Sequence, residues 1–486
     1  MNVAFRVDAG PGVGIGHFMR CLCLADHLRE AGASIRVVSG GLPASLAQML
    51  TDRGYECAAI DAAAQAVDAE ETRVALADKT WNWLVVDHYA LDERWEAALR
   101  GCAKQVLAID DLADRQHDCD LLLDQNLSTE GERRYAGKVP ARCRMLLGPR
   151  YALLREEFSR ARAASVPRTG SIARTFISFG GTDEANWTAA AIEAVVAARA
   201  DVGRVDVVIG REHGHRTDIE SVCRQHGFEC HVQAADVATL MSAADLGIGA
   251  GGVTMWERCC LGLPALTLAI AANQQPGVRE AARRGLVYSP ADEIMDRSAL
   301  ARHIACLAEN PLLREMLSRN GMAVVDGQGA ARVARAMGAD AMNIREATAD
   351  DAAALFGWRN DDSVRRFARR PEPITAADHL AWLHGVLADP NRVLLIGERR
   401  GRPAGVVRFD ITDNAAEVSI YRVPGVPGAG VGLRLLHAAE RWLAARKPHV
   451  ASLVAEVLGD NAPSHRLFRA AGYQRRATVY EKGLRS

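Results

Sequence analysis

The first 340 residues alternate between short apolar runs and longer amphipathic stretches rich in Ala, Leu and Arg. The apolar runs are continuous, which is typical of strands buried on both faces of a parallel sheet. In the first half of this segment the pattern predicts strands at residues 3–7, 34–38, 83–86, 106–109 and 121–123. Strands that alternate with helices in this way predict an α/β lobe.

A second series of the same kind follows the Pro/Arg/Ser segment at residues 165–170. Its apolar runs predict strands at residues 175–179, 205–209, 230–232, 246–248 and 265–268. We therefore expect two Rossmann-like lobes, at residues 1–160 and 171–338, each with a parallel sheet.

A different pattern begins at Ile344, after a small-residue stretch at 338–343. A helix comes first, then strands at 393–397, 403–409 and 416–421, and then another helix. This order predicts a separate α+β domain over residues 344–486. Three units suit a chain of 486 residues, since single domains usually hold about 100–200.

The overall charge is uninformative until it is divided by domain. With 49% hydrophobic and 24% charged residues, the chain is not a disordered one. The net charge of −1 gives no sign of a general nucleic-acid binder. Residues 344–486 hold 22 basic and 16 acidic side chains, so this domain is about +6 and the rest about −7. The basic domain is compatible with a phosphate-rich ligand and equally with a solvated basic face.

The start of the chain lacks the cationic and apolar regions of a signal peptide, and no apolar run approaches the roughly 18 residues of a membrane span. We expect a cytoplasmic protein with no membrane partner. The 11 cysteines form no Cys-x-x-Cys pair and no Cys/His cluster at zinc spacing. They are therefore expected to be reduced thiols, buried at Cys21, Cys23, Cys259 and Cys260, and no metal site is predicted.

A loop with four glycines follows the first strand and its polar end, Arg6-x-Asp8. Backbone amides in such a loop, together with the N-terminus of the next helix, are suited to an anion or a sugar. The glycine spacing differs from the dinucleotide fingerprint. His17 stands where this loop enters the helix, and His is the usual general base near neutral pH. The loop residues expected to face substrate are Gly14, Gly16 and Arg20.

The second lobe carries two further glycine loops. One follows the strand at 175–179, and the other, residues 251–254, opens a helix whose amides and Thr254 hydroxyl suit a diphosphate. Glu257, one turn into that helix, either accepts hydrogen bonds from a ribose or is a solvated helix carboxylate. Two amide side chains after the last strand either bind a sugar or cap a helix. The candidate substrate-binding residues are Gly180, Gly181, Gly251, Gly252, Thr254, Glu257, Asn273 and Gln274.

Together these motifs resemble the UDP-sugar hydrolases of pseudaminic acid biosynthesis, which are GT-B-like nucleotide-sugar enzymes. The resemblance covers roughly residues 1–335 and implies that water attacks C1 of UDP-2,4-diacetamido-2,4,6-trideoxy-β-L-altropyranose and releases UDP. It implies a base or water-orienting group at His17, a sugar site at Tyr89 and Asn273, a catalytic role for Asp8, and UDP in the second lobe. The motifs that carry it are Arg6-x-Asp8-x-Gly10, Gly14-x-Gly16-His17, Val86-Asp87-His88-Tyr89, Ile109-Asp110-Asp111, Phe179-Gly180-Gly181-x-Asp183 and Gly251-Gly252-x-Thr254-x-x-Glu257.

In the last domain, glycines again stand between a strand and a helix, at residues 428–432, where free amides suit a pyrophosphate. A block from Asn461 to Tyr473 follows one strand later. Near the start of the domain stands Trp358-Arg359-Asn360-Asp361. This succession resembles the GNAT acetyltransferases, in particular the subgroup that contains the aminosugar N-acetyltransferase of the same pathway. The resemblance implies acetyl-CoA as co-substrate, bound by Gly428, Gly430, Gly432, Asn461 and Ser464.

Two residues of this domain bear on its proton transfers. Glu417, on the strand before the glycines, either deprotonates the acceptor amine, directly or through water, or is a half-exposed strand carboxylate. Phe468 stands where many GNAT members carry a Tyr that acts as general acid, and Phe cannot donate a proton. Either water, His465 or another group serves instead, or the domain is slow or altered.

The leading hypothesis is a bifunctional enzyme that acetylates a UDP-4-amino sugar and then hydrolyses the product. Its partners would be a UDP-sugar and acetyl-CoA, with no nucleic acid. The alternative is a GT-B-like glycosyltransferase, with an acceptor sugar in place of water, fused to a non-catalytic GNAT-like binding module.

Overall fold

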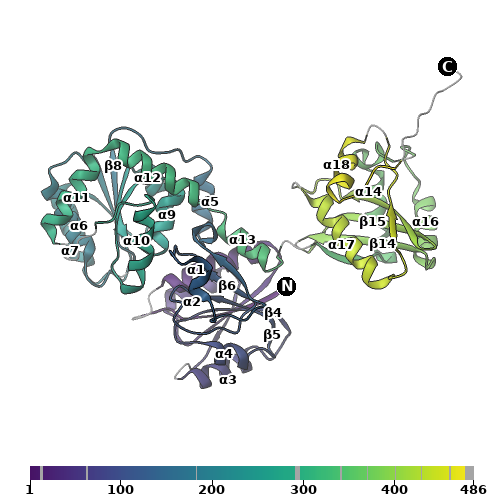
Figure 1. The fold of residues 1–486 in the computed structure, drawn as a ribbon, viewed down its shortest axis with the longest axis horizontal. Coiled ribbons are helices and arrows are strands. Elements are labelled where there is room, and N and C mark those ends of the chain that lie inside the picture. Colours follow the sequence, from purple (N-terminus) through teal and green to yellow (C-terminus); the bar gives the residue numbers. More distant parts are fainter. Residues whose placement is uncertain are drawn as a thin grey trace, which may run out of the picture. The chain divides into compact units, whose positions relative to one another are not determined.

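The computed structural model describes residues 1–10, 15–61, 64–181, 183–290, 296–339, 342–368, 370–399, 401–427, 430–458 and 461–476. The chain divides into two compact units, Met1–Met337 and Gly338–Ser486, which Figure 1 shows from purple to green and from green to yellow. The division lies beside the small-residue stretch that precedes Ile344. The first unit contains two sheets and the second contains one.

The first lobe is built on a seven-stranded sheet with the order β3-β2-β1-β4-β5-β6-β7, in which all neighbours are parallel. The five predicted strands are present. The two edge strands, β3 and β7, were not predicted. The outermost, β3, exposes most of its side chains, so its sequence shows no pattern of buried positions. The strands are β1 (Asn2–Val7), β2 (Ser34–Ser39), β3 (Glu56–Ala59), β4 (Trp81–Asp87), β5 (Ala103–Ile109), β6 (Leu121–Asp124) and β7 (Arg144–Leu147).

The helices of this lobe connect successive parallel strands. They are α1 (Gly16–Glu30), α2 (Ala44–Asp52), α3 (Gln65–Ala75) and α4 (Glu93–Ala98), with two 3₁₀ turns, η1 (Gly131–Tyr135) and η2 (Pro149–Tyr151). Crossover helices of this kind turn all strands the same way, so their carboxyl ends meet at one edge of the sheet.

The second lobe holds a five-stranded parallel sheet with the order β10-β9-β8-β11-β12. All five strands were predicted: β8 (Arg174–Ser178), β9 (Arg204–Ile209), β10 (Glu229–Val232), β11 (Leu246–Ala250) and β12 (Ala265–Leu268). The helices are α5 (Glu156–Arg162), α6 (Trp187–Ala198), α7 (Arg216–His226), α8 (Val237–Ala243), α9 (Val253–Leu261), α10 (Gln275–Arg283), α11 (Arg297–Glu309) and α12 (Pro311–Val324), with the 3₁₀ turn η3 (Ala272–Gln274).

The last helix of the first unit, α13 (Gly329–Ala336), returns to the first lobe. It packs against α1 and η2, and the buried indole nitrogen of Trp83 donates to the carbonyl of Met337 at 2.9 Å. The sequence pattern did not indicate this return, since the helical period shows only which face is apolar and not what covers it.

The second unit is an α+β domain on a mixed sheet with the order β13-β14-β15-β16-β17. Its first three pairings are antiparallel and the last is parallel. The strands are β13 (Asn343–Glu346), β14 (Arg392–Arg399), β15 (Arg402–Thr412), β16 (Ala415–Arg422) and β17 (Ser452–Val454). The helices are α14 (Ala352–Asn360), α15 (Asp362–Arg365), α16 (Ala376–Ala388), α17 (Val431–Arg446) and α18 (Ala462–Ala470), with the 3₁₀ turn η4 (Ala349–Asp351).

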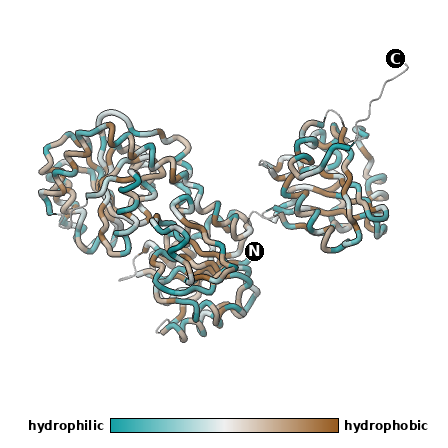
Figure 2. Tube along the Cα trace, viewed as in Figure 1, coloured by the Kyte–Doolittle hydropathy of each residue, from teal (hydrophilic) through white to brown (hydrophobic). Residues whose placement is uncertain are grey.

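The predicted fold class, two Rossmann-like lobes followed by an α+β domain, is confirmed. Figure 2 shows hydrophobic segments on the central strands and mixed colours on the outer helices. The thiols predicted to be buried, Cys21, Cys23, Cys259 and Cys260, are buried. No helix in the described ranges is long and apolar enough to cross a membrane.

Two glycines of the second unit should respond oppositely to replacement by alanine. A Cβ at Gly397 of β14 would collide with Leu435 of α17, whereas one at Gly385, exposed on α16, would meet nothing within 4 Å. We expect Gly397→Ala to lower the free energy of unfolding by about 1–3 kcal/mol through overpacking, and Gly385→Ala to raise it by roughly 0.5–1 kcal/mol. Urea unfolding measures both, and equal signs would contradict the packing described here.

Candidate functional site

The first lobe joins His17 to a carboxylate at the end of a neighbouring strand. His17 is the second residue of α1, and its Nδ1 lies 2.6 Å from Oδ1 of Asp87. Asp87 ends β4, which pairs with β1 so that Val7 lies opposite Asp87. The carboxyl ends of these two strands therefore bring the residues together. With Nδ1 bound to the carboxylate, Nε2 is the ring nitrogen left to face a substrate.

Arg20, one turn farther along α1, connects this carboxylate to a second one. Its Nε and Nη2 donate to the two oxygens of Asp87 at 2.6 and 2.7 Å, and its Nη1 donates to Oδ2 of Asp111 at 3.0 Å. Burial on its own raises the pKa of the Asp87 carboxyl, but Arg20 and His17 outweigh it, and that pKa lies well below its usual range. Asp87 is therefore ionised beside His17.

Tyr89 links the two lobes at the same place. Its hydroxyl donates to Oδ1 of Asp111 at 2.8 Å and accepts a hydrogen bond from Nδ2 of Asn273, in η3 of the second lobe, at 3.1 Å. Its ring stands edge-on to His17 with centroids 4.6 Å apart. Burial and the Asp111 carboxylate raise the pKa of Tyr89, so the hydroxyl keeps its proton. Three predicted residues, His17, Tyr89 and Asn273, thus lie together.

Asp8 has a different set of partners. Its carboxylate accepts from Arg6 Nη1 at 2.5 Å, Ser39 Oγ at 2.9 Å and the Gly40 amide at 2.7 Å, and it pairs with His88 Nε2 at 3.1 Å. Burial opposes ionisation, but His88 and Arg6 lower the pKa of Asp8 far below its usual range. With these four partners, the Asp8 carboxylate holds the loop after β2 and the ring of His88 in place.

Ile15, the residue before α1, lies close to the glycines that follow β8 in the second lobe. Gly16 begins α1, and the side chain of Ile15 would lie 3.3 Å from a Cβ on Gly181. Gly180 has a φ of +101°, which favours glycine. Gly14 lies outside the described residues. Ile15, directly before α1 and two residues from His17, therefore lies close to Gly181 after β8.

The second glycine loop of this lobe packs against the predicted amide side chains. Gly252 is the N-cap of α9 with a φ of +76°, and no side chain caps this helix. A Cβ on Gly251 would lie 2.6 Å from Val278 Cγ2 and 3.2 Å from Gln274 Oε1. The Thr254 hydroxyl is 3.4 Å from the Gly251 carbonyl. The loop thus leaves its helix amides for a ligand, with Gln274 at its side.

Glu257 is not the solvated carboxylate of the alternative interpretation, because it is only 5% exposed. One of its oxygens lies 3.4 Å from Arg155 Nη2, in the segment that joins the lobes. Burial raises the pKa of the Glu257 carboxyl, and the positive charge of Arg155 opposes this rise.

The residues whose roles the sequence did not indicate are the partners of the predicted ones. Asp87 and Asp111 were noted only as parts of strand-end motifs, and Arg20 only as a loop residue. Asn126, which no motif included, accepts a hydrogen bond from Trp256 Nε1 at 3.1 Å, so it connects the lobes at a second point. The signal available in the sequence was position, since polar residues at the ends of parallel strands face the ligand edge of the sheet.

In the second unit, the predicted loop again opens a helix. Gly430 is the N-cap of α17 with a φ of +75°, and the helix has neither a side-chain cap nor an acid in its first turn. Gly432 lies in that first turn, and Gly428 lies outside the described residues. β16 pairs with β17 only over Ala415–Glu417, so its later residues extend past that pairing. Free helix amides beside an unpaired strand edge fit a pyrophosphate with an extended amide chain.

Asn461 and Ser464 form the cap of α18 instead of an open donor pair. The Asn461 side chain accepts from the Ser464 amide at 3.1 Å. Phe468 is 8% exposed, belongs to the apolar core and contacts Tyr473 edge-on at 5.0 Å. The Tyr473 hydroxyl donates to Glu440 at 2.9 Å. Glu417 is exposed on β16, opposite Asp410 of β15.

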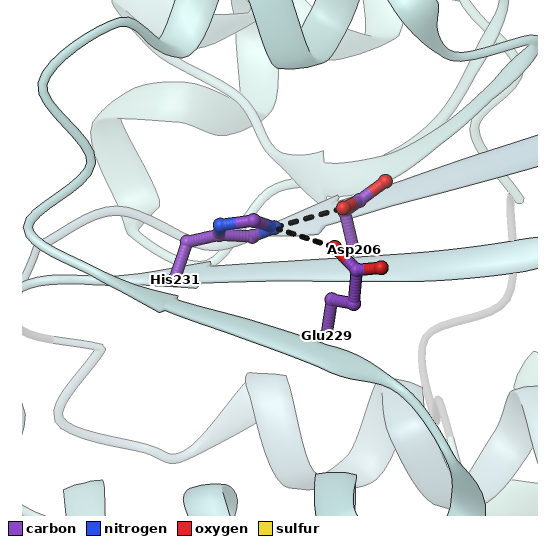
Figure 3. A group of neighbouring side chains, drawn as sticks. All are labelled: Asp206, Glu229 and His231. Carbon is purple, nitrogen blue, oxygen red and sulfur yellow. Dashed lines mark hydrogen bonds and ion pairs between the residues drawn. The ribbon is translucent and has the colours of Figure 1, made fainter.

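One acid and histidine group lies apart from these loops, on β9 and β10 (Figure 3). His231 Nε2 is 2.8 Å from Asp206 Oδ1 and 3.9 Å from Glu229 Oε2. The second oxygen of Asp206 lies 3.3 Å from Arg174 Nε. Because Arg174 and His231 already balance the buried carboxylate, we interpret the group as a structural ion pair.

Comparison with known proteins identifies the second unit. Residues 342–474 match the family model described as an acetyltransferase (GNAT) domain. A Bacillus subtilis protein provisionally named a phosphinothricin acetyltransferase is 31% identical over 140 residues, which cover 27% of this chain and 83% of that protein. The second unit belongs to the GNAT acetyltransferase family. The matched range of the GNAT domain includes Gly430 and the helix α17 that it caps.

The first unit resembles nucleotide-sugar proteins. A UDP-2,4-diacetamido-2,4,6-trideoxy-β-L-altropyranose hydrolase of Campylobacter jejuni is 27% identical over 191 residues, 38% of this chain and 62% of that enzyme. An uncharacterised protein of Methanocaldococcus jannaschii is 20% identical across 98% of this chain and 97% of its own length, so it spans the GNAT domain as well. The solved structure of Acinetobacter baumannii MurG covers 70% of this chain and 99% of its own, at 16% identity and a TM-score of 0.48.

Neutralising Asp87 should destabilise the first unit. Asp87→Asn removes a buried carboxylate that holds both Arg20 and His17, so we expect the free energy of unfolding to fall by about 3–5 kcal/mol. Asp114→Asn is the control, because Asp114 pairs with Arg115 at 3.0 Å on a 59% exposed side chain, and it should cost less than about 1 kcal/mol. Chemical denaturation measures both, and equal effects would contradict the network.

Proposed function

We propose that the chain is a bifunctional nucleotide-sugar enzyme whose first unit hydrolyses UDP-2,4-diacetamido-2,4,6-trideoxy-β-L-altropyranose to UDP and the free sugar. The observation that carries the proposal is the His17–Asp87 pair beside the Tyr89–Asn273 bridge between the lobes. A histidine oriented by a buried carboxylate is the arrangement of a general base. The partial likeness to the Campylobacter hydrolase supports this substrate.

In this mechanism His17 Nε2 accepts a proton from water as the water oxygen attacks C1 of the sugar. The bond between C1 and the diphosphate oxygen breaks, and UDP leaves with the electron pair. Asp87 holds the tautomer that keeps Nε2 available and stabilises the imidazolium as it forms. Arg20 keeps Asp87 ionised throughout. Tyr89 and Asn273 offer a hydroxyl and an amide to the acetamido and hydroxyl groups of the sugar.

The second lobe would hold the UDP leaving group. The amides at the start of α9 and the Thr254 hydroxyl suit the diphosphate, since a helix N-terminus favours negative charge. Glu257 is placed one turn deeper, where a carboxylate suits the ribose hydroxyls, and Gln274 flanks the glycine loop. Gly181 lies close to Ile15, so the sugar would be enclosed between the lobes.

The GNAT domain would acetylate the 4-amino group of UDP-4-amino-4,6-dideoxy-N-acetyl-β-L-altrosamine. Acetyl-CoA, when bound, supplies the acetyl thioester. The amides at the start of α17 would hold its pyrophosphate, and the edge of β16 beyond Glu417 would align its extended arm. Glu417 would take the proton from the amine, directly or through water. Phe468 is buried and donates nothing, so the proton that the thiol receives comes from water or from another side chain such as His465.

The two steps are consecutive, because the acetylated sugar nucleotide of the GNAT domain is the substrate of the hydrolase. A covalent connection between the two domains raises the local concentration of the intermediate. Release of UDP without any acceptor sugar separates this proposal from a glycosyltransferase with the same fold.

Replacing the base should separate the two reactions. We expect His17→Ala to lower the rate of UDP release by about 10²–10⁴-fold and to accumulate the acetylated UDP-sugar from UDP-amino sugar and acetyl-CoA. Mass spectrometry detects both products. His226→Ala, on the exposed end of α7, is the matched control and should behave as wild type. Unchanged UDP release by His17→Ala would exclude it as the base.

The role of Glu417 can be tested in the acetylation reaction of the GNAT domain. In a chain that also carries His17→Ala, we expect Glu417→Gln to slow acetylation by about 10²-fold or more, since the amide cannot accept the amine proton. The matched control is Glu372→Gln, another exposed acid of the same domain. The measurement is thiol release from acetyl-CoA at several pH values. A rate equal to that of the control variant would assign the proton transfer to another group.

A further inference from the structure

Arg258 of α9 is a fully buried cation without a carboxylate partner. Its exposed fraction is 0%, and among the described residues it takes part in no ion pair. Its Nη2 donates to the Ala250 carbonyl at 2.6 Å and to the Thr267 hydroxyl at 3.1 Å. Its Nε and Nη1 are buried and make no hydrogen bond in the described part of the chain. A guanidinium has five N–H donors, so most of this group is unsatisfied.

The side chain lies directly beneath the second glycine loop. Helical side chains lean toward the N-terminus of their helix, and Arg258 reaches from the second turn of α9 to the carbonyl that precedes Gly251. The strand beside it, β11, has glycines where it faces the arginine side chain. A Cβ on Gly247 would lie 3.1 Å from its Cδ, and one on Gly249 would lie 2.9 Å from its Nη1. The arginine therefore packs directly on these two glycines of β11, although a Cβ on Gly249 would also collide with the Ser178 carbonyl oxygen.

Among the residues of this lobe that the structure describes, no carboxylate forms an ion pair with Arg258. Neighbouring residues on a helix do not face each other, and Glu257 turns to Arg155 instead. Burial lowers the pKa of Arg258 to about 10, partly opposed by Cys259 and Glu257, so the group is still charged at neutral pH. A buried charge is costly unless it is paired. The helix N-terminus above adds positive potential at the same place, so the loop carries an excess that an anion would balance.

We propose that Arg258 is a positioning residue that provides a built-in countercharge for the diphosphate of the nucleotide. It does not touch the ligand. Its hydrogen bond fixes the Ala250–Gly251 peptide at the entrance to α9, and its charge acts through the loop in a medium of low dielectric. The site is thereby selective for a nucleoside diphosphate over the uncharged nucleoside. This inference rests on the proposed UDP site of the second lobe.

The test compares the binding of UDP and uridine to the full chain by calorimetry. Arg258→Gln keeps one amide donor toward Ala250 but removes the charge, and we expect the Kd for UDP to rise about tenfold or more while the Kd for uridine changes less than about twofold. Arg258→Lys keeps a cation and should retain most of the UDP affinity. Because a buried charge is weakly screened, the loss in the Gln variant should persist at high salt.

Thr267→Val is the structural control, since it removes one hydrogen bond of Arg258 and leaves the charge. We expect it to lower thermal stability without changing the ratio of the two Kd values. An Arg258→Gln variant that binds UDP as tightly as wild type, or that loses UDP and uridine affinity equally, would overturn the countercharge while leaving the UDP site in place. A wild-type chain that does not bind UDP would overturn both.

Discussion

The contact of Arg20 with Asp87 and Asp111 is the interaction on which the site of the first unit depends. Arginine stays protonated throughout the physiological range, so Arg20 places a fixed positive charge between two largely buried carboxylates. One carboxylate orients His17 and the other anchors Tyr89. A single buried cation therefore positions two groups of the candidate site that follow different strands. Removing Asp87 would break two hydrogen bonds of Arg20 and the contact that orients His17.

The parallel sheet supplies the geometry that this network needs. β1, β4 and β5 are neighbours in the sheet, so the residues that follow their carboxyl ends share one edge. The second lobe has the same construction, and its strand-end loops carry Gly180, Gly251 and Asn273. Three contacts bring the carboxyl edges of the two sheets together: Ile15 with Gly181, Asn126 with Trp256 of α9, and Tyr89 with Asn273. Sheets of this kind bind ligands at the ends of their strands.

The sequence was sufficient for the elements that bury apolar runs. The predicted strands are present, whereas β3, β7, β13 and β17 were missed because short strands at sheet edges bury too little to leave a pattern. Site residues were predicted where they lie in or beside a glycine loop. The hydrogen bonds among them could not be predicted, because His17 and Asp87 are 70 residues apart in the chain and only the order of the strands makes them neighbours. Asn461 could be named as polar but not recognised as a helix cap.

The adjacent pair Glu257 and Arg258 shows why residue identity alone could not assign roles in the second lobe. In the sequence the two charges look self-neutralising. On a helix they point about 100° apart, so Glu257 meets Arg155 while Arg258 enters the space that Gly247 and Gly249 leave. An apolar residue of similar volume would fill that space without burying a charge. A buried cation next to a helix N-terminus fits an anionic ligand, because the negative charge of the ligand would offset the free energy of burying the arginine. A diphosphate carries that charge.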